Sequence, residues 1–223
     1  MEVLDISKLA MNAKEAHSVE EATKRVRNPI LEPKLDGIRV LVHVSGHGIT
    51  MYARSGNDKS DKLPHVDEEL IRAFNPGTWL DWEAVAFNED GSQHWGGAQS
   101  VMAAAPMKDP VATARMRLVV FDILSDGELD VRSESLRERR ARLEDVFTRH
   151  SEILRHTMLV MQDEATQEVH DAIVAAGYEG TMIKSLDMPY TSGKRTFAWV
   201  KIKLIETADV VITGYKPGKG KFS

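Results

Sequence analysis

Apolar and polar residues change their spacing repeatedly along this chain, from the two-residue period of strands to the wider period of helices. Alternating or short apolar runs bounded by Gly, Pro, Asn or Asp predict strands, and apolar residues three or four apart predict helices. The expected strands are 30–44, 49–56, 78–88, 117–124, 158–162, 179–186 and 197–204, and the expected helices are 18–27, 64–74, 133–147 and 164–177. Hairpins interrupted by helices indicate an α+β fold of antiparallel sheets flanked by helices.

Local signals refine several of these elements. Ser18 and Glu21 form a capping-box pattern at the start of the first helix, and Pro29 is expected to end it. The helix 133–147 carries its leucines on one side and its arginines on the other. The Gly- and Ala-rich segment 91–115 is expected to be a loop region with one helical turn.

The pattern predicts a domain boundary near the C-terminus. Residues 1–206 are expected to form one domain without internal repeats. Residues 207–223 begin a new strand and then enter a Gly- and Lys-rich loop without a pairing partner. This segment is therefore predicted to be a linker and the first strand of a second domain.

Composition places the chain among ordinary soluble globular proteins, with 42% hydrophobic and 28% charged residues. No apolar run approaches the roughly 18 residues that a membrane-spanning helix needs. The N-terminus lacks the apolar core of a secretory signal. The absence of cysteine excludes disulfides and thiolate metal sites, and it fits a reducing cytoplasm.

The net charge of −5 argues at first against a nucleic-acid partner, because phosphate binding usually needs a basic excess. The charge is uneven, however, and the C-terminal part is locally basic. Its cations are Lys184, Lys194, Arg195, Lys201, Lys203, Lys216, Lys219 and Lys221. They could face phosphates while acids elsewhere keep the protein soluble, or they could be solvated side chains of strands and loops.

The segment Lys34-Leu35-Asp36-Gly37-Ile38-Arg39 carries the most specific chemistry. Gly37 allows the backbone to approach a ligand, and Arg39 can hold an anionic or hydroxyl-rich ligand. Lys34 can act as a nucleophile once nearby cations or desolvation favour its neutral amine. A hairpin with a surface lysine is the alternative explanation of the same residues.

Further short motifs follow in a fixed order. They are Tyr52 to Asn57 with an Arg-x-Gly element, Leu80 to Ala84, Phe121 to Leu124, Glu179 to Lys184 and Trp199 to Lys203. Together with Lys34 to Arg39, they make the chain resemble the covalent nucleotidyltransferases, which comprise ATP-dependent DNA ligases, RNA ligases and mRNA capping enzymes. The resemblance extends from Glu32 to about Lys221, and it implies the nucleotidyltransferase fold followed by an oligonucleotide-binding (OB) domain.

The resemblance implies a role for each motif. Lys34 is the implied catalytic residue, which carries AMP covalently. Residues implied to contact ATP or AMP are Glu32, Lys34, Arg39, Arg54, Glu83, Phe121, Arg195, Lys201 and Lys203. Phe121 would stack on adenine, and Glu32 lies near the segment that reads the adenine edge. Glu83 and Glu179 are the implied ligands of Mg²⁺.

Strand geometry supports part of this assignment. Lys201 and Lys203 are two apart in a strand, so they project from one face while Val200 and Ile202 point into the core. Two lysines on one face suit the α-phosphate of ATP and the charge that grows as pyrophosphate leaves. The alternative for the two lysines is an exposed lysine ladder. The alternative for Phe121 is an ordinary position in the core.

Two positions depart from a simple motif pattern. Trp82 stands where the family has glycine between Asp81 and Glu83, so it must find space on the opposite face of the strand. Regular alternation would also place Glu179 and Lys184 on opposite faces. One of these two residues is therefore expected to lie at a bend or at the end of its strand.

Other candidate sites are weaker. His43 and His47 are four apart across a turn, which does not favour a metal pair. The run from Gly218 to Lys221 lacks the spacing of a phosphate-binding loop. Trp95 could touch DNA or pack within the fold.

Within the family, the Glu-Gly-Thr-Met-Ile-Lys and Trp-Val-Lys-Ile-Lys motifs favour a DNA ligase of the compact bacteriophage and bacterial type. The implied reaction joins AMP from ATP to Lys34, passes it to the 5′-phosphate of nicked double-stranded DNA, and seals the nick with the 3′-hydroxyl. The implied cofactors are ATP and Mg²⁺, and the expected protein is a cytoplasmic monomer in DNA repair, replication or recombination. With its OB domain incomplete, this 223-residue form is expected to adenylylate slowly and seal poorly. RNA ligase, a capping-type enzyme and a non-catalytic nucleotide- or DNA-end-binding module are the alternatives.

Overall fold

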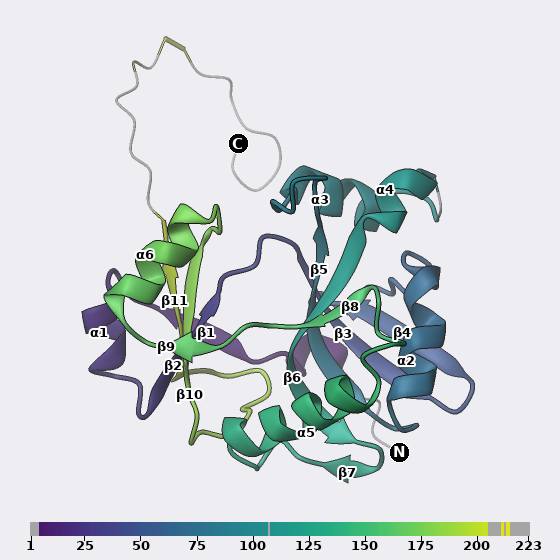
Figure 1. Ribbon diagram of the computed structural model, residues 1–223, viewed down its shortest axis with the longest axis horizontal. Helices are drawn as coiled ribbons and strands as arrows, with labels where there is room; N and C mark the ends of the chain where they lie inside the picture. The colour runs from purple at the N-terminus through teal and green to yellow at the C-terminus, as the bar shows by residue number, and fades with distance from the viewer. Residues whose placement is uncertain (1–4, 107, 205–210, 212, 215–223) are drawn as a thin grey trace.

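Two β-sheets lie side by side and carry helices on their outer faces (Figure 1). The computed structural model describes residues 5–106, 108–204, 211 and 213–214. Sheet A has the strand order β1-β11-β10-β2-β9, and sheet B has the order β4-β3-β5-β6-β7 with β8 paired to β6. Pairing is antiparallel except between β1 and β11 and between β6 and β8. The predicted α+β fold is confirmed.

The elements have the following bounds. The strands are β1 (Asn12–Glu15), β2 (Pro29–Pro33), β3 (Ile38–Ser45), β4 (Gly48–Ala53), β5 (Trp79–Ala86), β6 (Met116–Asp126), β7 (Leu129–Asp130), β8 (Thr157–Leu159), β9 (Asp163–Glu164), β10 (Gly180–Ser185) and β11 (Arg195–Lys203). The α-helices are α1 (Val19–Thr23), α2 (Asp67–Ala73), α3 (Trp95–Ala103), α4 (Pro110–Ala114), α5 (Leu136–Arg149) and α6 (Gln167–Ala175). The 3₁₀ helices are η1 (Ile6–Lys8) and η2 (Pro64–Val66).

The segment 30–44 differs most from its prediction as a single strand. It forms β2 in sheet A and β3 in sheet B, and residues 34–37 join them. Gly37 lies so close to the backbone of β5 that a Cβ atom there would overlap the Ala84 carbonyl oxygen. The glycine is therefore needed for packing against β5, and the crossing places Lys34 between the two sheets.

Helix starts follow the capping signals, whereas helix lengths differ. Ser18 Oγ accepts a hydrogen bond from the Glu21 N–H at 3.1 Å, and Ser135 forms a reciprocal capping box with Glu138. Helix α1 ends at Thr23, ahead of the predicted end at Pro29. The predicted loop region 91–115 contains two helices, α3 and α4. The short strands β1, β7 and β9 were not predicted, because their sequences lack a periodic apolar pattern.

One arginine contradicts the predicted arginine face of α5. Arg139 is 1% exposed, and its guanidinium makes two hydrogen bonds to the buried Asp122 carboxylate, Nε to Oδ1 at 2.7 Å and Nη2 to Oδ2 at 2.9 Å. A buried charge is stable when it is paired in this way. The pair fastens α5 to β6 directly beside Phe121.

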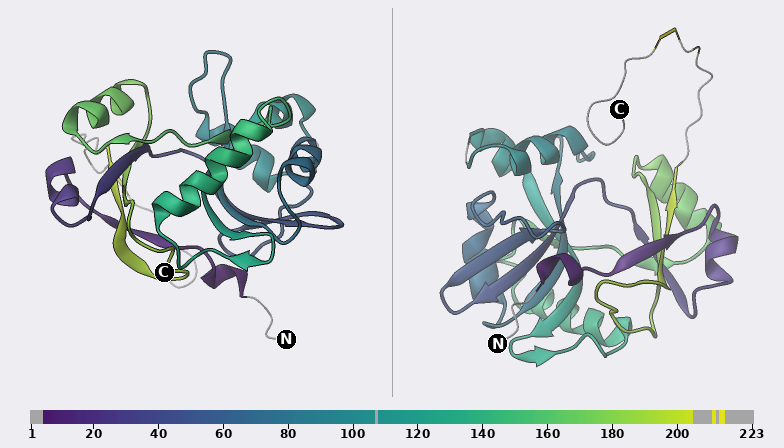
Figure 2. Two further views of the ribbon diagram at one scale, coloured as in Figure 1. Left: turned by 60° about the horizontal axis from the view of Figure 1, so that its bottom comes forward. Right: turned by 180° about the vertical axis from the view of Figure 1, so that it is seen from behind.

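Three apolar clusters hold these layers together, and a smaller fourth one, of Val85, Val119 and Val160, packs against Leu35 and Phe121. The largest packs sheet B against α2, α3 and α5, and another packs sheet A against α1 and α6. The third lies between the sheets and joins Met11 near the N-terminus to Leu41, Leu124 and Trp199. Figure 2 shows the N-terminal segment passing from η1 to β1 across the back of the molecule. This third cluster forms the floor below the space between the sheets.

Replacing Gly37 with alanine is expected to lower the free energy of unfolding by about 1–3 kcal/mol, because the new methyl group overlaps the Ala84 carbonyl. Gly46→Ala is the matched control, since a Cβ at Gly46 meets nothing within 4 Å. Urea unfolding of both variants measures the difference. Equal midpoints would show that the crossing does not depend on this contact.

Candidate active site

A cavity of about 250 Å³ opens between the two sheets beside the crossing segment. All the residues predicted to contact ATP line it, namely Glu32, Lys34, Arg39, Arg54, Glu83, Phe121, Arg195, Lys201 and Lys203. Asn12, Ala13, Pro33, Leu35, Val160, Met182, Lys184 and Trp199 complete the lining. Residues that are distant in sequence thus meet at one charged and aromatic pocket.

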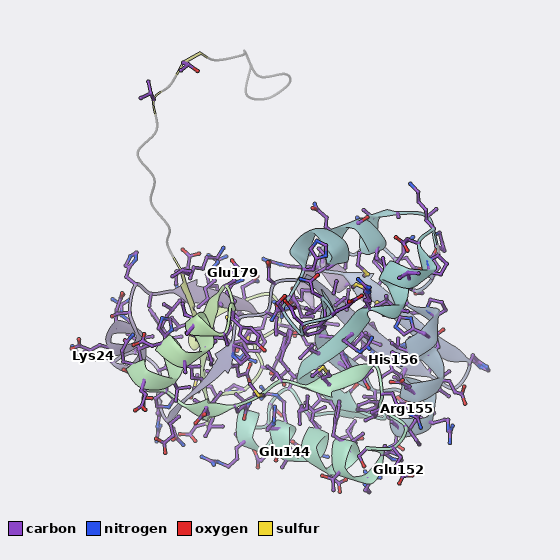
Figure 3. All side chains as sticks on the ribbon, turned by 45° about the horizontal axis from the view of Figure 1, so that its top comes forward. Lys24, Glu144, Glu152, Arg155, His156 and Glu179 are labelled. Atoms are coloured by element: carbon purple, nitrogen blue, oxygen red, sulfur yellow. The ribbon has the colours of Figure 1, made fainter. Side chains whose placement is uncertain are left out.

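Lys34 lines this pocket and directly follows β2. Its N–H donates to the Gly180 carbonyl at 2.9 Å, which fixes the backbone to β10. Its ammonium group contacts the Glu179 carboxylate, and Lys203 Nζ lies 3.3 Å from the other oxygen of Glu179. Figure 3 labels Glu179, which precedes β10. The expectation that one of Glu179 and Lys184 lies at a strand end is confirmed, because Glu179 directly precedes β10 and Lys184 lies within it.

The lysine face of β11 is also confirmed. Lys201 and Lys203 both line the pocket, while Val200 and Ile202 are buried in the cluster behind sheet A. Lys201 Nζ lies 2.6 Å from the Glu15 carboxylate on β1. Each lysine of this face therefore has a carboxylate partner that phosphate oxygens could replace.

A buried ion pair forms the opposite end of the pocket. Glu32 on β2 and Lys184 on β10 are 2% and 1% exposed, and the Lys184 ammonium lies 2.6 Å from Glu32 Oε2. The same ammonium lies 4.4 Å from the ring centroid of Trp199 and 4.7 Å from that of Phe121. The rings of Phe121 and Trp199 are arranged edge to face, with their centroids 5.8 Å apart. This end combines an apolar aromatic wall with a fixed carboxylate, which suits a planar base.

Arg39 joins the two sheets beneath the pocket. Its guanidinium donates to both oxygens of Asp81, at 2.8 and 2.5 Å, and to the Met11 carbonyl at 2.6 Å. The Tyr190 hydroxyl donates to Asp81 at 2.6 Å and accepts from the Met11 N–H at 2.8 Å. Arg39 therefore lines the pocket, but most of its donors hold protein groups in place.

The two carboxylates predicted to bind a metal differ in charge state. Burial raises the pKa of Glu83 to about 8, so its carboxyl group is mainly protonated at neutral pH in the free chain. Burial also raises the pKa of Glu179, but the hydrogen bonds from Lys34 and Lys203 outweigh it, and the pKa is lowered overall. The described residues contain no group of three or more acidic or histidine side chains that could hold a metal ion.

Comparison with known proteins identifies the family. A family model described as "ATP dependent DNA ligase domain" matches residues 10–203. The chain belongs to this family. The ligase domain is 35% identical to a DNA ligase of Archaeoglobus fulgidus over 221 residues, which are 96% of this chain and 39% of that protein. A probable DNA ligase of Streptomyces coelicolor is 33% identical over 96% of this chain and 42% of its own length. The chain thus spans about two fifths of these relatives.

Solved structures share the fold of this ligase domain. The ligase domain of M. tuberculosis LigD superposes with a TM-score of 0.70 at 21% identity, covering 90% of this chain and 61% of that one. The ATP-dependent DNA ligase of bacteriophage T7, in complex with ATP, gives a TM-score of 0.66 at 16% identity, covering 90% of this chain and 70% of that one.

No helix in the described part of the chain is both long and apolar enough to cross a membrane.

Trp82, the departure from the family glycine, packs as expected on the opposite face of β5. Its side chain is fully buried in the core behind sheet B and meets Phe74 edge to face at 6.3 Å. Glu83 remains on the pocket side. The ligase domain thus accommodates the tryptophan in its core without losing the carboxylate.

Sequence reasoning missed several pocket residues of the ligase domain. Lys184 and Trp199 belong to quoted motifs, and their even spacing from Met182 and Lys201 could have assigned them to the pocket face. Asn12, which accepts a hydrogen bond from Arg54, gave no sequence signal. The predicted boundary between 1–206 and 207–223 lies outside the described residues.

Proposed function

We propose that this ligase domain is the adenylyltransferase part of an ATP-dependent DNA ligase. Lys34 is its nucleophile, and Glu32, Arg39, Arg54, Glu83, Phe121, Arg195, Lys201 and Lys203 bind ATP or AMP. The observation that carries the proposal is that Lys34 lines one pocket together with an aromatic wall and a lysine face. The DNA ligase names of the relatives support the choice of DNA as substrate.

The geometry supports a direct displacement. With the base between Phe121 and Glu32, the α-phosphate would lie near Lys34, and the Lys34 nitrogen would form a bond to phosphorus as the bond to pyrophosphate breaks. The proton that Lys34 must lose has an acceptor in contact, the Glu179 carboxylate. Lys201 and Lys203 would neutralise the phosphate charge that grows during this step. Positioning and charge neutralisation supply most of the catalysis.

Glu83 and Glu179 fit the proposed role of holding Mg²⁺. Both flank Lys34, and Mg²⁺ in nucleotide sites takes one or two carboxylates together with phosphates and water. The ion would screen the phosphate charge against the attacking amine. A bound cation would also favour the ionised form of Glu83, which burial disfavours in the free chain.

The proposal is tested by incubating the chain with α-labelled ATP and Mg²⁺ and measuring label on denatured protein. Retained label at one AMP per chain is the expected result, at a slow rate. If the chain takes up no label, even when an OB domain is supplied, the enzyme assignment is wrong. The non-catalytic binding module is then the remaining alternative. Adenylylated chain is then mixed with nicked DNA or nicked RNA, and transfer of AMP to DNA ends is expected. Transfer to RNA ends alone would favour RNA ligase.

A further inference from the structure

The carboxylate of Glu32 has a second partner besides Lys184. Gln162 Nε2 donates to Glu32 Oε1 at 2.8 Å, while the Lys184 ammonium lies 2.6 Å from Oε2. Each oxygen of this buried carboxylate therefore has a different partner, a hydrogen bond from Gln162 at Oε1 and an ion-pair contact with Lys184 at Oε2. Gln162 does not line the pocket itself, so it reaches the pocket through Glu32.

The fold places Gln162 opposite Glu32 by strand register. Strand β9 pairs antiparallel with β2, with Leu31 opposite Asp163, so the next pair along the two chains is Glu32 and Gln162. Gln162 belongs to the segment between β8 and β9, which crosses from sheet B to sheet A at the front of the molecule (Figure 1). The same segment supplies Val160 to the pocket wall. One short crossing thus carries both a wall residue and the partner of Glu32.

We propose that Gln162 is a positioning residue that fixes the Glu32 carboxylate and thereby sets the preference for adenine over guanine. This inference rests on the proposed function. A single contact with Lys184 leaves the carboxylate free to pivot about that contact. The second contact with Gln162 removes this freedom and directs the remaining lone pairs into the pocket.

The chemistry of a fixed carboxylate explains the preference. A carboxylate paired with lysine can accept hydrogen bonds and cannot donate them. The exocyclic amine of adenine can donate to it, whereas guanine presents a carbonyl oxygen at the same position, and two acceptors repel. A carboxylate that can turn away loses both the attraction to adenine and the rejection of guanine. The loss should therefore appear in the ratio between the two nucleotides.

The test measures KM and kcat for labelling of the chain by α-labelled ATP and by α-labelled GTP. Gln162→Leu is expected to raise KM for ATP roughly tenfold or more, the effect of a lost hydrogen bond to a charged group, with kcat changed less than about twofold. The ratio of kcat/KM between ATP and GTP should fall by a similar factor. Asp163→Asn, at the next residue, which is exposed, is the matched control and should keep the wild-type ratio.

Gln162→Glu separates positioning from a purely structural role. It keeps the length of the side chain but sets a second carboxylate against Glu32, so its defect relative to wild type should ease as the pH falls from 8 to 6. The defect of Gln162→Leu should not change with pH. If Gln162→Leu does not fold, Gln162→Asn replaces it, because its amide is one methylene short of Glu32 and the same loss is expected.

The outcomes separate this inference from the proposed function. A wild-type chain that takes no label from ATP overturns the proposed function and the inference together. A wild-type chain that prefers ATP, with Gln162 variants that keep both KM and the ATP-to-GTP ratio, overturns the inference and leaves the proposed function intact. A lowered ratio confined to the Gln162 variants supports it.

Discussion

Replacing Lys34 with alanine is expected to abolish the protein–AMP adduct while the fold remains intact. Removal of a covalent nucleophile lowers the rate by more than about 10⁴-fold, because no neighbouring group takes over the bond to phosphorus. Lys184 is buried against Glu32, and Lys203 already contacts Glu179, so neither is placed to attack in the position of Lys34.

Labelling with α-labelled ATP measures this effect, and the matched control is Lys24→Ala. Lys24 is exposed, pairs with Glu20 four residues earlier on α1, and lies at the outer edge of the molecule away from Glu179 (Figure 3). The control should label at the wild-type rate. Thermal unfolding should shift little in Lys34→Ala, since Lys34 is partly exposed and Glu179 keeps Lys203 as a partner. Labelling of Lys34→Ala at even a tenth of the wild-type rate would contradict the assigned nucleophile.

The largest stability effect is expected at Asp122. Its replacement by alanine leaves the Arg139 guanidinium buried without its carboxylate, which costs about 3–5 kcal/mol. For a domain of this size the midpoint of thermal unfolding should fall by roughly 6–20 °C. The Asp122→Leu, Arg139→Met double variant should recover much of the lost stability, because two apolar side chains leave no charge buried away from water.

Asp145→Ala, on the helix α5 that carries Arg139, is the matched control. Asp145 pairs with Arg149 at 2.6 Å, but both side chains are more than half exposed and solvent screens the pair, so the loss of stability should be small. Calorimetry of the single and double variants measures these differences. Similar midpoints for Asp122→Ala and Asp145→Ala would mean that the buried pair does not stabilise the junction of α5 and β6.

The sequence predicted the pocket better than it predicted the chain path. Strand periodicity assigned Lys201 and Lys203 to one face correctly, because that property depends on neighbouring residues of one strand. The division of 30–44 between two sheets depends instead on the close contact of Gly37 with β5, a distant segment. An alternating pattern continues through such a crossing without a visible break.

Buried polar partners were the least predictable features. Arg139 follows a polar pattern on its helix, and its burial depends on Asp122 on a strand that precedes it. Gln162 reaches Glu32 through the register of β9 with β2, which no local pattern contains. Such pairs require the tertiary structure, because each member alone has the composition of a surface residue.

Lys34 is proposed to carry AMP, and locating the adduct on the wild-type chain tests this directly. The chain is treated with ATP and Mg²⁺, digested, and its peptides are sequenced by mass spectrometry under conditions that preserve the phosphoramidate. One AMP on the Lys34 side chain, absent from the other lysine peptides, is the expected result. AMP on Lys184, Lys201 or Lys203 with an unmodified Lys34 would contradict Lys34 as the nucleophile.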